Sequence, residues 1–280
     1  MSGTPIAEAN IAPSKNDIVL NIIQKELEGK SVFFPLVQDV SRFAKKGQKT
    51  ISFLKRSSVT AINKDCNASN PTQDFALTTD QLALDQKPYV SFTISDCDEL
   101  ESVVNLEAEA AKAAASAIQR YVDDAILNAL IAGAGLTSAA LTMTRDGVLE
   151  MLKYVDCNFA DDIVIVASCV QKYDGLLKEA SFTEQQVYGA PVIKDGSMAS
   201  LYGYPLVFSK RLPTDQALVF DKNALAIGFQ RGVKFRKQAC NDVGADAWNY
   251  TWDAKFGVKI LQENELGAGV GKSPWIAKLS

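Results

Sequence analysis

Apolar residues recur at every third or fourth position between residues 98 and 131, which is the spacing of one face of an α-helix. The stripe comprises Leu100, Val104, Ala111, Ala114, Ile118, Val122, Ala125 and Ala129. Alanine, the residue with the highest helix propensity, is abundant in the middle of the segment. A helix of this length would measure roughly 50 Å, so the pattern predicts an elongated subunit.

Two segments before this helix have the alternating pattern of β-strands, at residues 50–54 and 88–95. In the second segment, Val90, Phe92 and Ile94 share one face, and serine and threonine occupy the other. A polar stretch with a short expected strand at residues 75–78 separates the two. We therefore expect a long β arm over about residues 45–95. Because a lone hairpin is marginally stable in water, the arm needs a surface to lie on.

Helical and strand patterns alternate after residue 145, which predicts a compact α/β unit. The expected helices span residues 146–155 and about 169–180, with a short one near 198–202. The expected strands span residues 163–166, 206–209 and 217–220, and two more follow at 233–239 and 250–262. The chain would begin with an extended arm over residues 1–15 and an amphipathic helix from Asn16, and it would end in a glycine-rich tail.

The composition excludes several kinds of chemistry. The chain has 280 residues, of which 47% are hydrophobic and 22% charged, as in ordinary globular proteins, and it contains no histidine. Histidine-dependent triads, most catalytic zinc sites and histidine-ligated haem are therefore excluded. Five scattered cysteines without a C-x-x-C pair indicate free thiols in a reducing compartment, and Cys157 and Cys169 are expected to be small core residues.

No segment has the pattern of a signal peptide or of a membrane span. The longest uncharged stretch, residues 125–144, contains glycine, serine, threonine and asparagine. We interpret it as the end of the long helix followed by a glycine loop, and we expect no membrane partner.

Charge is distributed unevenly along the chain, although the total is only −4. Residues 36–95 carry +3, and residues 96–131 carry −6. The basic cluster comprises Arg42, Lys45, Lys46, Lys49, Lys55 and Arg56. It can be a solvated strand edge, a protein contact or a nucleic-acid contact, and the two oppositely charged segments can be solvated faces or can meet across a subunit contact.

The tail contains one motif that resembles a phosphate-binding loop, Gly267 to Ser273. The loop pattern G-x-x-x-x-G-K-S requires glycine at position 266, which is Leu266, and a helix after the serine, where Pro274 follows instead. Adjacent carboxylates such as Asp123 and Asp124 do not face each other on a helix. Asp161 and Asp162 are expected to cap the turn before a buried strand. The sequence therefore predicts no catalytic, cofactor or metal residues.

The order of the elements and several local segments resemble the major capsid protein of tailed bacteriophages, whose Hong Kong 97-type fold is shared with encapsulin shells. The segment DGSMASLYGYPLV at residues 195–207 is similar to the G-x-L-x-G-x-P-V segment of that family. Residues 217–221, 226–228, 231–232 and 256–259 are similar to its following stretches. The resemblance covers nearly the whole chain.

The resemblance implies an α+β Hong Kong 97-like capsid fold with six parts. These would be an N-terminal arm (1–40), an extended β loop (41–97), a spine helix opening the peripheral domain (98–137), an α/β axial domain (138–228), peripheral-domain strands (229–262) and a C-terminal tail (263–280).

The resemblance also implies a non-enzymatic structural role without cofactors. The chain would assemble with itself into pentamers and hexamers of an icosahedral shell around double-stranded DNA, without sequence-specific DNA contact. Portal, scaffolding and decoration proteins are the other expected partners. The expected locations are the virion capsid and, during assembly, the host bacterial cytoplasm. The alternatives are an encapsulin-like nanocompartment and a soluble α/β nucleotide-binding enzyme.

We hypothesise a subunit interface in which the positively charged residues at the start of the β arm dock near acidic residues of a neighbouring subunit's spine helix. The arm side of this interface comprises Lys45, Lys46, Lys49, Lys55, Arg56, Val90, Phe92 and Ile94. The spine side comprises Asp98, Glu99, Glu101, Glu107 and Glu109.

A first prediction concerns the glycine-rich motif. We expect the protein to bind no ATP and Lys272→Ala to assemble as wild type does, because Leu266 breaks the motif. Isothermal titration with ATP and particle counts by electron microscopy check this. Micromolar ATP affinity that is lost in Lys272→Ala would contradict it.

Overall fold

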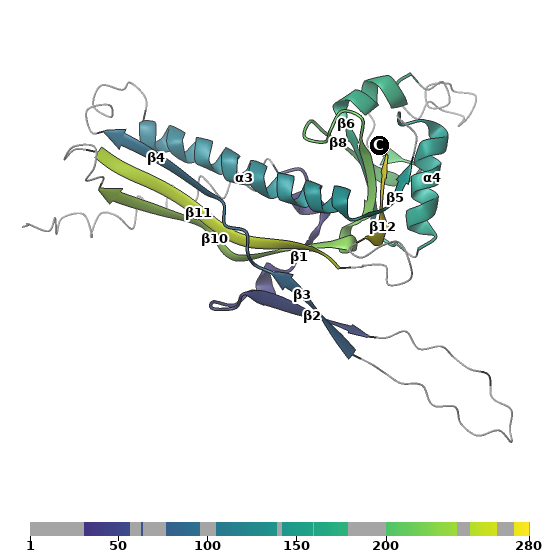
Figure 1. Cartoon of the computed structure of the whole chain (residues 1–280). Helices are drawn as coiled ribbons and strands as arrows, with labels where there is room; N and C mark the ends of the chain where they lie inside the picture. The colour runs from purple at the N-terminus through teal and green to yellow at the C-terminus, as the bar shows by residue number, and fades with distance from the viewer. Residues whose placement is uncertain are drawn as a thin grey trace, which may run out of the picture.

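The computed structural model describes residues 31–56, 63, 77–95, 105–138, 142–158, 160–178, 200–239, 247–261 and 272–279. The molecule is elongated (Figure 1). A long sheet with one helix along it forms the first lobe, a compact lobe adjoins one end, and a two-stranded hairpin projects from the middle. The helix predicted from Asn16 lies outside the described residues.

The helical elements are α3 (Leu106–Ala132), α4 (Arg145–Asp156), a π-helix η3 (Gln171–Leu176), and the 3-10 turns η1 (Phe34–Leu36), η2 (Ser41–Phe43) and η4 (Lys222–Ala224). The strands are β1 (Gln38–Asp39), β2 (Thr50–Arg56), β3 (Leu77–Ala83), β4 (Tyr89–Ser95), β5 (Ala134–Ser138), β6 (Ile163–Ser168), β7 (Ser200–Leu201), β8 (Tyr204–Ser209), β9 (Ala217–Asp221), β10 (Leu225–Ala239), β11 (Ala247–Ile260) and β12 (Ser273–Leu279).

Helix α3 is the predicted spine helix, but it begins later than expected. The side chain of Asn105 accepts a hydrogen bond from the Ala108 backbone N–H at 3.0 Å, and Asn105 itself has extended backbone angles. An asparagine in this position caps a helix because it satisfies a free N–H group of the first turn. The helix therefore starts at Leu106 rather than residue 98, and it ends where Gly133 donates to the Ala129 carbonyl oxygen. Its length is roughly 40 Å.

One face of the four-stranded sheet, in the order β1-β10-β11-β4, packs against α3. Ala111, Ala114 and Ile118 of the helix lie fully buried against Tyr250 and Trp252. Small side chains on the helix allow its axis to approach large aromatic side chains on the sheet without leaving a cavity. The predicted strands 233–239 and 250–262 are confirmed as parts of β10 and β11, which begin earlier.

The prediction of the arm's second strand was wrong. Strands β2 and β3 form the projecting hairpin, with Ile51 opposite Leu82 and Arg56 opposite Leu77. Strand β4, expected in the arm, pairs instead with β11 in the long sheet. Period-two alternation identifies a strand and its two faces, but it carries no information on which strand is the hydrogen-bonded partner.

The compact lobe is built on a six-stranded sheet in the order β5-β12-β9-β6-β8-β7. Residues 273–279, expected in a tail, form the interior strand β12, in which Ile276, Ala277 and Leu279 are fully buried. Strand β5 likewise replaces part of the expected glycine loop after α3, and β10 already belongs to the long sheet. The expected boundaries of the axial domain and the tail therefore shift, because strands distant in sequence complete one sheet.

The glycine of β5 shows how closely these distant strands approach. A Cβ atom on Gly135 would collide with the backbone carbonyl of Ser273, so β5 and β12 require glycine there. Lys272 precedes this strand, whereas a phosphate loop needs a helix after its lysine. The structure therefore contradicts the nucleotide-binding alternative at this motif.

Three local expectations in the compact lobe need correction. The backbone N–H groups of Asp161 and Asp162 donate to Asp221 Oδ2 at 2.7 and 3.1 Å, so Asp221 caps this turn. Cys157 is exposed and Cys169 half-buried, so neither is a core residue. The helix predicted at 169–180 contains a π-helical turn.

None of the helices in the described ranges is long and apolar enough to cross a membrane.

A second prediction follows from the packing of α3. Ala114→Leu should lower the free energy of unfolding by about 1–3 kcal/mol, because the larger side chain overpacks the contact with Tyr250 and Trp252. Ala113→Leu is the matched control, since Ala113 is exposed on the same turn. Urea unfolding measures both variants, and equal stabilities would contradict the burial of this stripe.

Candidate subunit interface

The basic residues of the hypothesised interface lie where the hairpin joins the long sheet. Lys45, Lys46 and Lys49 are exposed in the turn before β2, and Lys55 is half-buried within β2. Gly47 has a φ of 92°, which lets this turn adopt a left-handed conformation that favours glycine. Three lysines therefore project from one tight turn at the root of the hairpin.

The root of the hairpin is held firmly by the long sheet. Ile51 and Leu82 are buried with Val40 and Ala226, and the Gln230 side-chain amide of β10 donates to the Gln48 carbonyl oxygen. Lys259 of β11 forms an ion pair with Asp80 of β3. The hairpin therefore leaves the subunit in a direction fixed by packing on both strands.

Further out, the hairpin exposes two leucines. Leu54 is 74% exposed and Leu77 is 59% exposed. Leu54 lies opposite Thr79, two residues from Leu77, so both leucines lie on the same face of the hairpin. Large apolar side chains that stay uncovered on a projecting element are typical of a contact with another molecule. The sequence analysis did not assign these two leucines to the interface. The signal for Leu54 was that it breaks the alternation of apolar and polar residues that Ile51 and Phe53 begin.

The apolar face of β4 is partly covered within the same subunit, although Phe92 is 37% exposed. Val90 and Ile94 are half-buried against the cluster of Tyr250 and Trp252, and the Phe92 ring meets Trp252 edge-on at 5.9 Å. These residues were assigned to the interface because an isolated hairpin could not bury them. That reason was wrong, since β4 is a strand of the long sheet.

The acidic side of the hypothesised interface is only partly described. Glu107 and Glu109 lie in the first turn of α3, where negative charge is favourable beside the helix N-terminus. Glu109 forms an ion pair with Lys112 at 2.7 Å. Asp98, Glu99 and Glu101 lie outside the described residues, so the pairing with a neighbour stays a prediction.

Two adjacent carboxylates of α3 join the helix to different parts of the molecule. Asp123, 2% exposed, accepts a hydrogen bond from the Ser31 hydroxyl at 2.5 Å and holds the start of the described chain. Asp124 forms an ion pair with Arg211 of the compact lobe at 2.7 Å, and Arg211 also donates to the Arg120 carbonyl oxygen. As expected, the two carboxylates do not form a dyad.

Burial raises the pKa of Asp123 above its usual value of 3.8, because the charged form loses hydration. The hydrogen bonds from Ser31 and from the backbone of Val32 and Phe33, together with the nearby Arg211 charge, act in the opposite direction without overcoming the effect of burial.

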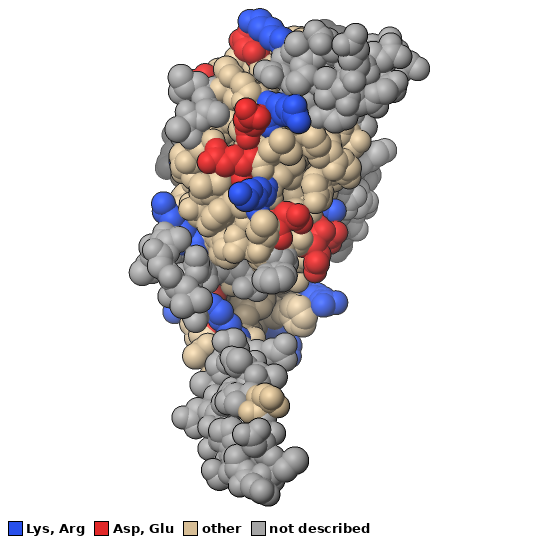
Figure 2. All heavy atoms as spheres, turned by 90° about the vertical axis from the view of Figure 1, so that its right-hand side faces the viewer, with Lys and Arg blue, Asp and Glu red and all other residues tan. Residues whose placement is uncertain are grey.

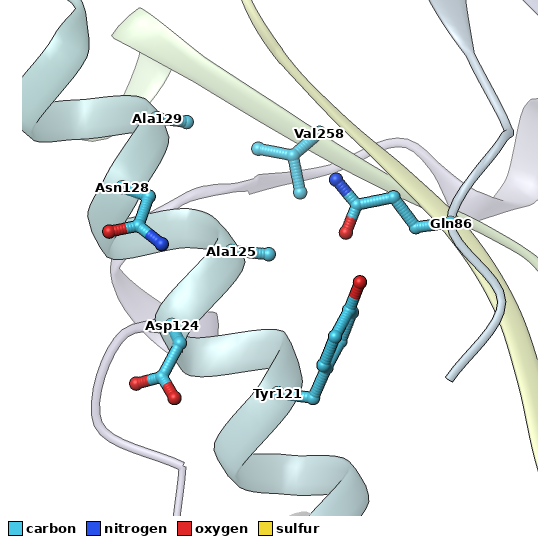
Figure 3. Close-up of a pocket in the computed structure, with 7 residues that line it drawn as sticks. All are labelled: Gln86, Tyr121, Asp124, Ala125, Asn128, Ala129 and Val258. Carbon is cyan, nitrogen blue, oxygen red and sulfur yellow. The ribbon is translucent and has the colours of Figure 1, made fainter. Parts of the chain in front are cut away.

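A cavity of about 350 Å³ lies beside this part of α3 (Figure 3). It is lined by Gln86, Tyr121, Asp124, Ala125, Asn128, Ala129 and Val258. Its only carboxylate, Asp124, is already paired with Arg211. Across the described ranges, no group of three acidic or cysteine side chains could hold a metal ion.

Figure 2 shows the molecule end-on, with basic and acidic side chains interspersed over the surface. A surface that presents both signs to its surroundings can pair with an identical surface, whereas a surface of one sign repels its own copies.

The comparisons with solved structures concern the fold. The chain is similar to a chain of Mycobacterium phage Che8, with 20% identity, a TM-score of 0.73 and coverage of 90% of this chain and 91% of that one. A chain from the capsid structure of the cyanophage P-SCSP1u matches with 13% identity and a TM-score of 0.70 over 89% and 87%. A virus-like particle from Pyrococcus furiosus matches with 7% identity and a TM-score of 0.62 over 95% and 99%. The sequence matches no protein-family model and no curated protein.

These matches cover between 89% and 95% of this chain. The chain therefore has the Hong Kong 97-like capsid fold, as the resemblance implied.

A third prediction concerns Asp123. Its raised pKa means that the protonated carboxyl stabilises the fold, fully below pH 3.8 and progressively less as pH rises through the folded-state pKa. Wild type should therefore lose stability relative to Asp123→Asn as pH rises from about 3.5 to 7. Thermal unfolding of both proteins across this range checks the sign. A stability difference that is constant or of opposite trend would contradict it.

Proposed function

We propose that this chain is the major capsid protein of a tailed bacteriophage, which assembles into pentamers and hexamers of an icosahedral shell around double-stranded DNA. The observation that carries the proposal is the fold, which aligns with a phage capsid chain over about nine-tenths of both chains. Its expected locations are the virion and, during assembly, the host bacterial cytoplasm.

The projecting hairpin supports self-assembly on physical grounds. A two-stranded element is marginally stable alone, and Leu54 and Leu77 leave apolar surface that another copy can bury. Exposed charge pairs between the lysines of the hairpin root and a neighbour's acids contribute only about 0–1 kcal/mol each. Repeated over hundreds of contacts, they set register more than strength.

The charge of the chain supports an enclosing role toward DNA. A net charge of −4 gives the wall little general attraction for phosphates, so DNA can be packed without sequence-specific contact. Portal, scaffolding and decoration proteins would complete such a particle.

An encapsulin-like shell is the second candidate, because the virus-like particle from Pyrococcus furiosus aligns over 95% of this chain. The two candidate shells differ in what they enclose. Purified particles should hold double-stranded DNA when produced with the complete set of phage proteins, and they would hold protein cargo instead under the alternative.

Electron microscopy of the purified protein is the decisive test. We expect closed, hollow shells of uniform diameter, with fivefold and sixfold clusters in class averages. A monomer at every concentration up to millimolar, in low and high salt, would overturn the proposal.

A fourth prediction concerns the hairpin. Deleting residues 58–86, the simplest loop deletion, would remove β3 with its buried Leu82, so the informative variant replaces residues 57–76 by Asn-Gly. This two-residue turn joins Arg56 to Leu77, which are already paired. We expect a folded subunit that forms small oligomers but no stable shells, measured by sedimentation and microscopy.

Point variants separate the charge and apolar contributions of the hairpin. Lys49→Glu, Lys55→Glu and Arg56→Glu together should slow assembly more in low salt than in high salt. Leu54→Gln with Leu77→Gln should weaken shells at all salt concentrations. Shells of wild-type stability in the shortened variant would show that the hairpin contributes nothing to closure.

A further inference from the structure

A buried carboxylate lies on the face of the long sheet that is turned away from α3. Its side chain, Asp253 of β11, is only 4% exposed. Its neighbour Trp252 packs toward the helix, so alternation directs Asp253 to the opposite face. Burying a charge is costly unless other charges compensate for it.

Three cations surround this carboxylate. Arg231 forms the nearest ion pair, Arg236 Nη2 lies 3.6 Å from Oδ1, and Lys87 Nζ lies 3.9 Å from Oδ2. The Asp253 oxygens make no hydrogen bond of ordinary geometry within the described chain, so these are contacts of charge rather than of aligned donors. We call these four residues the Asp253 cluster.

Two irregularities of β10 bring the cations together. Register shifts lie between Phe229 and Arg231 and between Arg231 and Lys234. Such bulges insert extra residues and redirect side chains. The two arginines therefore converge on one point, while Lys87 reaches it from the segment that leads into β4.

The cluster holds more positive charge than Asp253 neutralises. One carboxylate among three cations leaves +2, and the exposed Lys234, opposite Asp253 in the ladder, raises it to +3. The three cations of the cluster are 57%, 38% and 52% exposed, so an outside group can reach them. Because the chain totals −4, its remainder carries −7, which makes another copy a source of carboxylates.

The shape of the cluster favours a point charge over a polyanion. Its three cations lie within 4 Å of one carboxylate, whereas the phosphates of a duplex form a line that needs cations in a row. Tyr89, directly opposite Asp253, is 72% exposed. Exposed tyrosine beside arginine is the composition of contact centres between proteins.

We propose that the Asp253 cluster is the docking site for an acidic side chain of a second copy of this chain. The proposal rests on the proposed self-assembly and adds a contact on the sheet, separate from the hairpin. Asp253 keeps the cations in place, and the neighbour's carboxylate binds to the outer side of Lys87 and Arg236.

The test removes the two outer cations and leaves the Arg231–Asp253 pair intact. Lys87→Gln with Arg236→Gln should raise the subunit concentration needed for half-assembly about tenfold at ~0.1 M salt and less than about twofold at 1 M salt. Lys178→Gln with Lys210→Gln makes the same change in net charge on exposed residues of the compact lobe and should have a smaller effect. Equal effects of the two double variants would overturn the proposal.

A second measurement identifies the partner directly. Particles assembled from a mixture of ¹⁴N- and ¹⁵N-labelled subunits are treated with a carbodiimide, which joins a lysine amine to a contacting carboxylate. We expect Lys87 in cross-links between differently labelled chains. If intact particles give only same-chain links from Lys87 to Asp253, the proposal is overturned. It is also overturned if the Lys87→Gln, Arg236→Gln double variant assembles normally but loses binding to duplex DNA. If the wild-type protein never assembles, that result contradicts the proposed function rather than the docking site.

Discussion

The close contact between a helix of small residues and a sheet of large aromatic ones is the constraint on which the rest of this molecule depends. Ala111 and Ala114 lie against Tyr250 and Trp252 with no exposed surface. Burial of this kind is favourable in proportion to area and does not depend on direction, so it stabilises the part of the sheet that lies against the first half of α3. A subunit built around such a contact is long, and the other face of its sheet carries the root of the hairpin, where Ile51 and Leu82 are buried.

Helix α3 also determines how the two lobes meet. Near its C-terminal half, Arg211 of the compact lobe binds Asp124, while Asp123 holds the segment at Ser31. The helix then ends at Gly133, directly before the first strand of the compact lobe. The relative position of the lobes is therefore fixed by these polar contacts, by the chain connections between the lobes and by a buried apolar cluster. In that cluster Ile126 and Leu130 of α3 pack against strands of both sheets.

Much of the fold could be predicted from local patterns, because periodicity reports which residues are buried on one element. The spine helix was found in this way, and the strands at 163–166 and 217–220 were found from short continuous apolar runs. The role of β12 and the partner of β4 were missed, since pairing between distant strands leaves no local mark. Among site residues, the lysines of the hairpin root were found by their charge density. Arg211 and Asp253 were not, because their importance arises from neighbours that the fold brings together.

The two faces of the long sheet divide stability and specificity between them. The face toward α3 holds aromatic side chains, and its apolar contact is satisfied within the subunit. The opposite face carries Asp253 and its cations, whose interactions depend on distance and on salt. Charge contributes little to the strength of a contact, but a misplaced copy would set like charges against each other. A shell that grows by adding identical subunits needs such discrimination at each addition. The part of this face that the hairpin root does not cover is free to provide it.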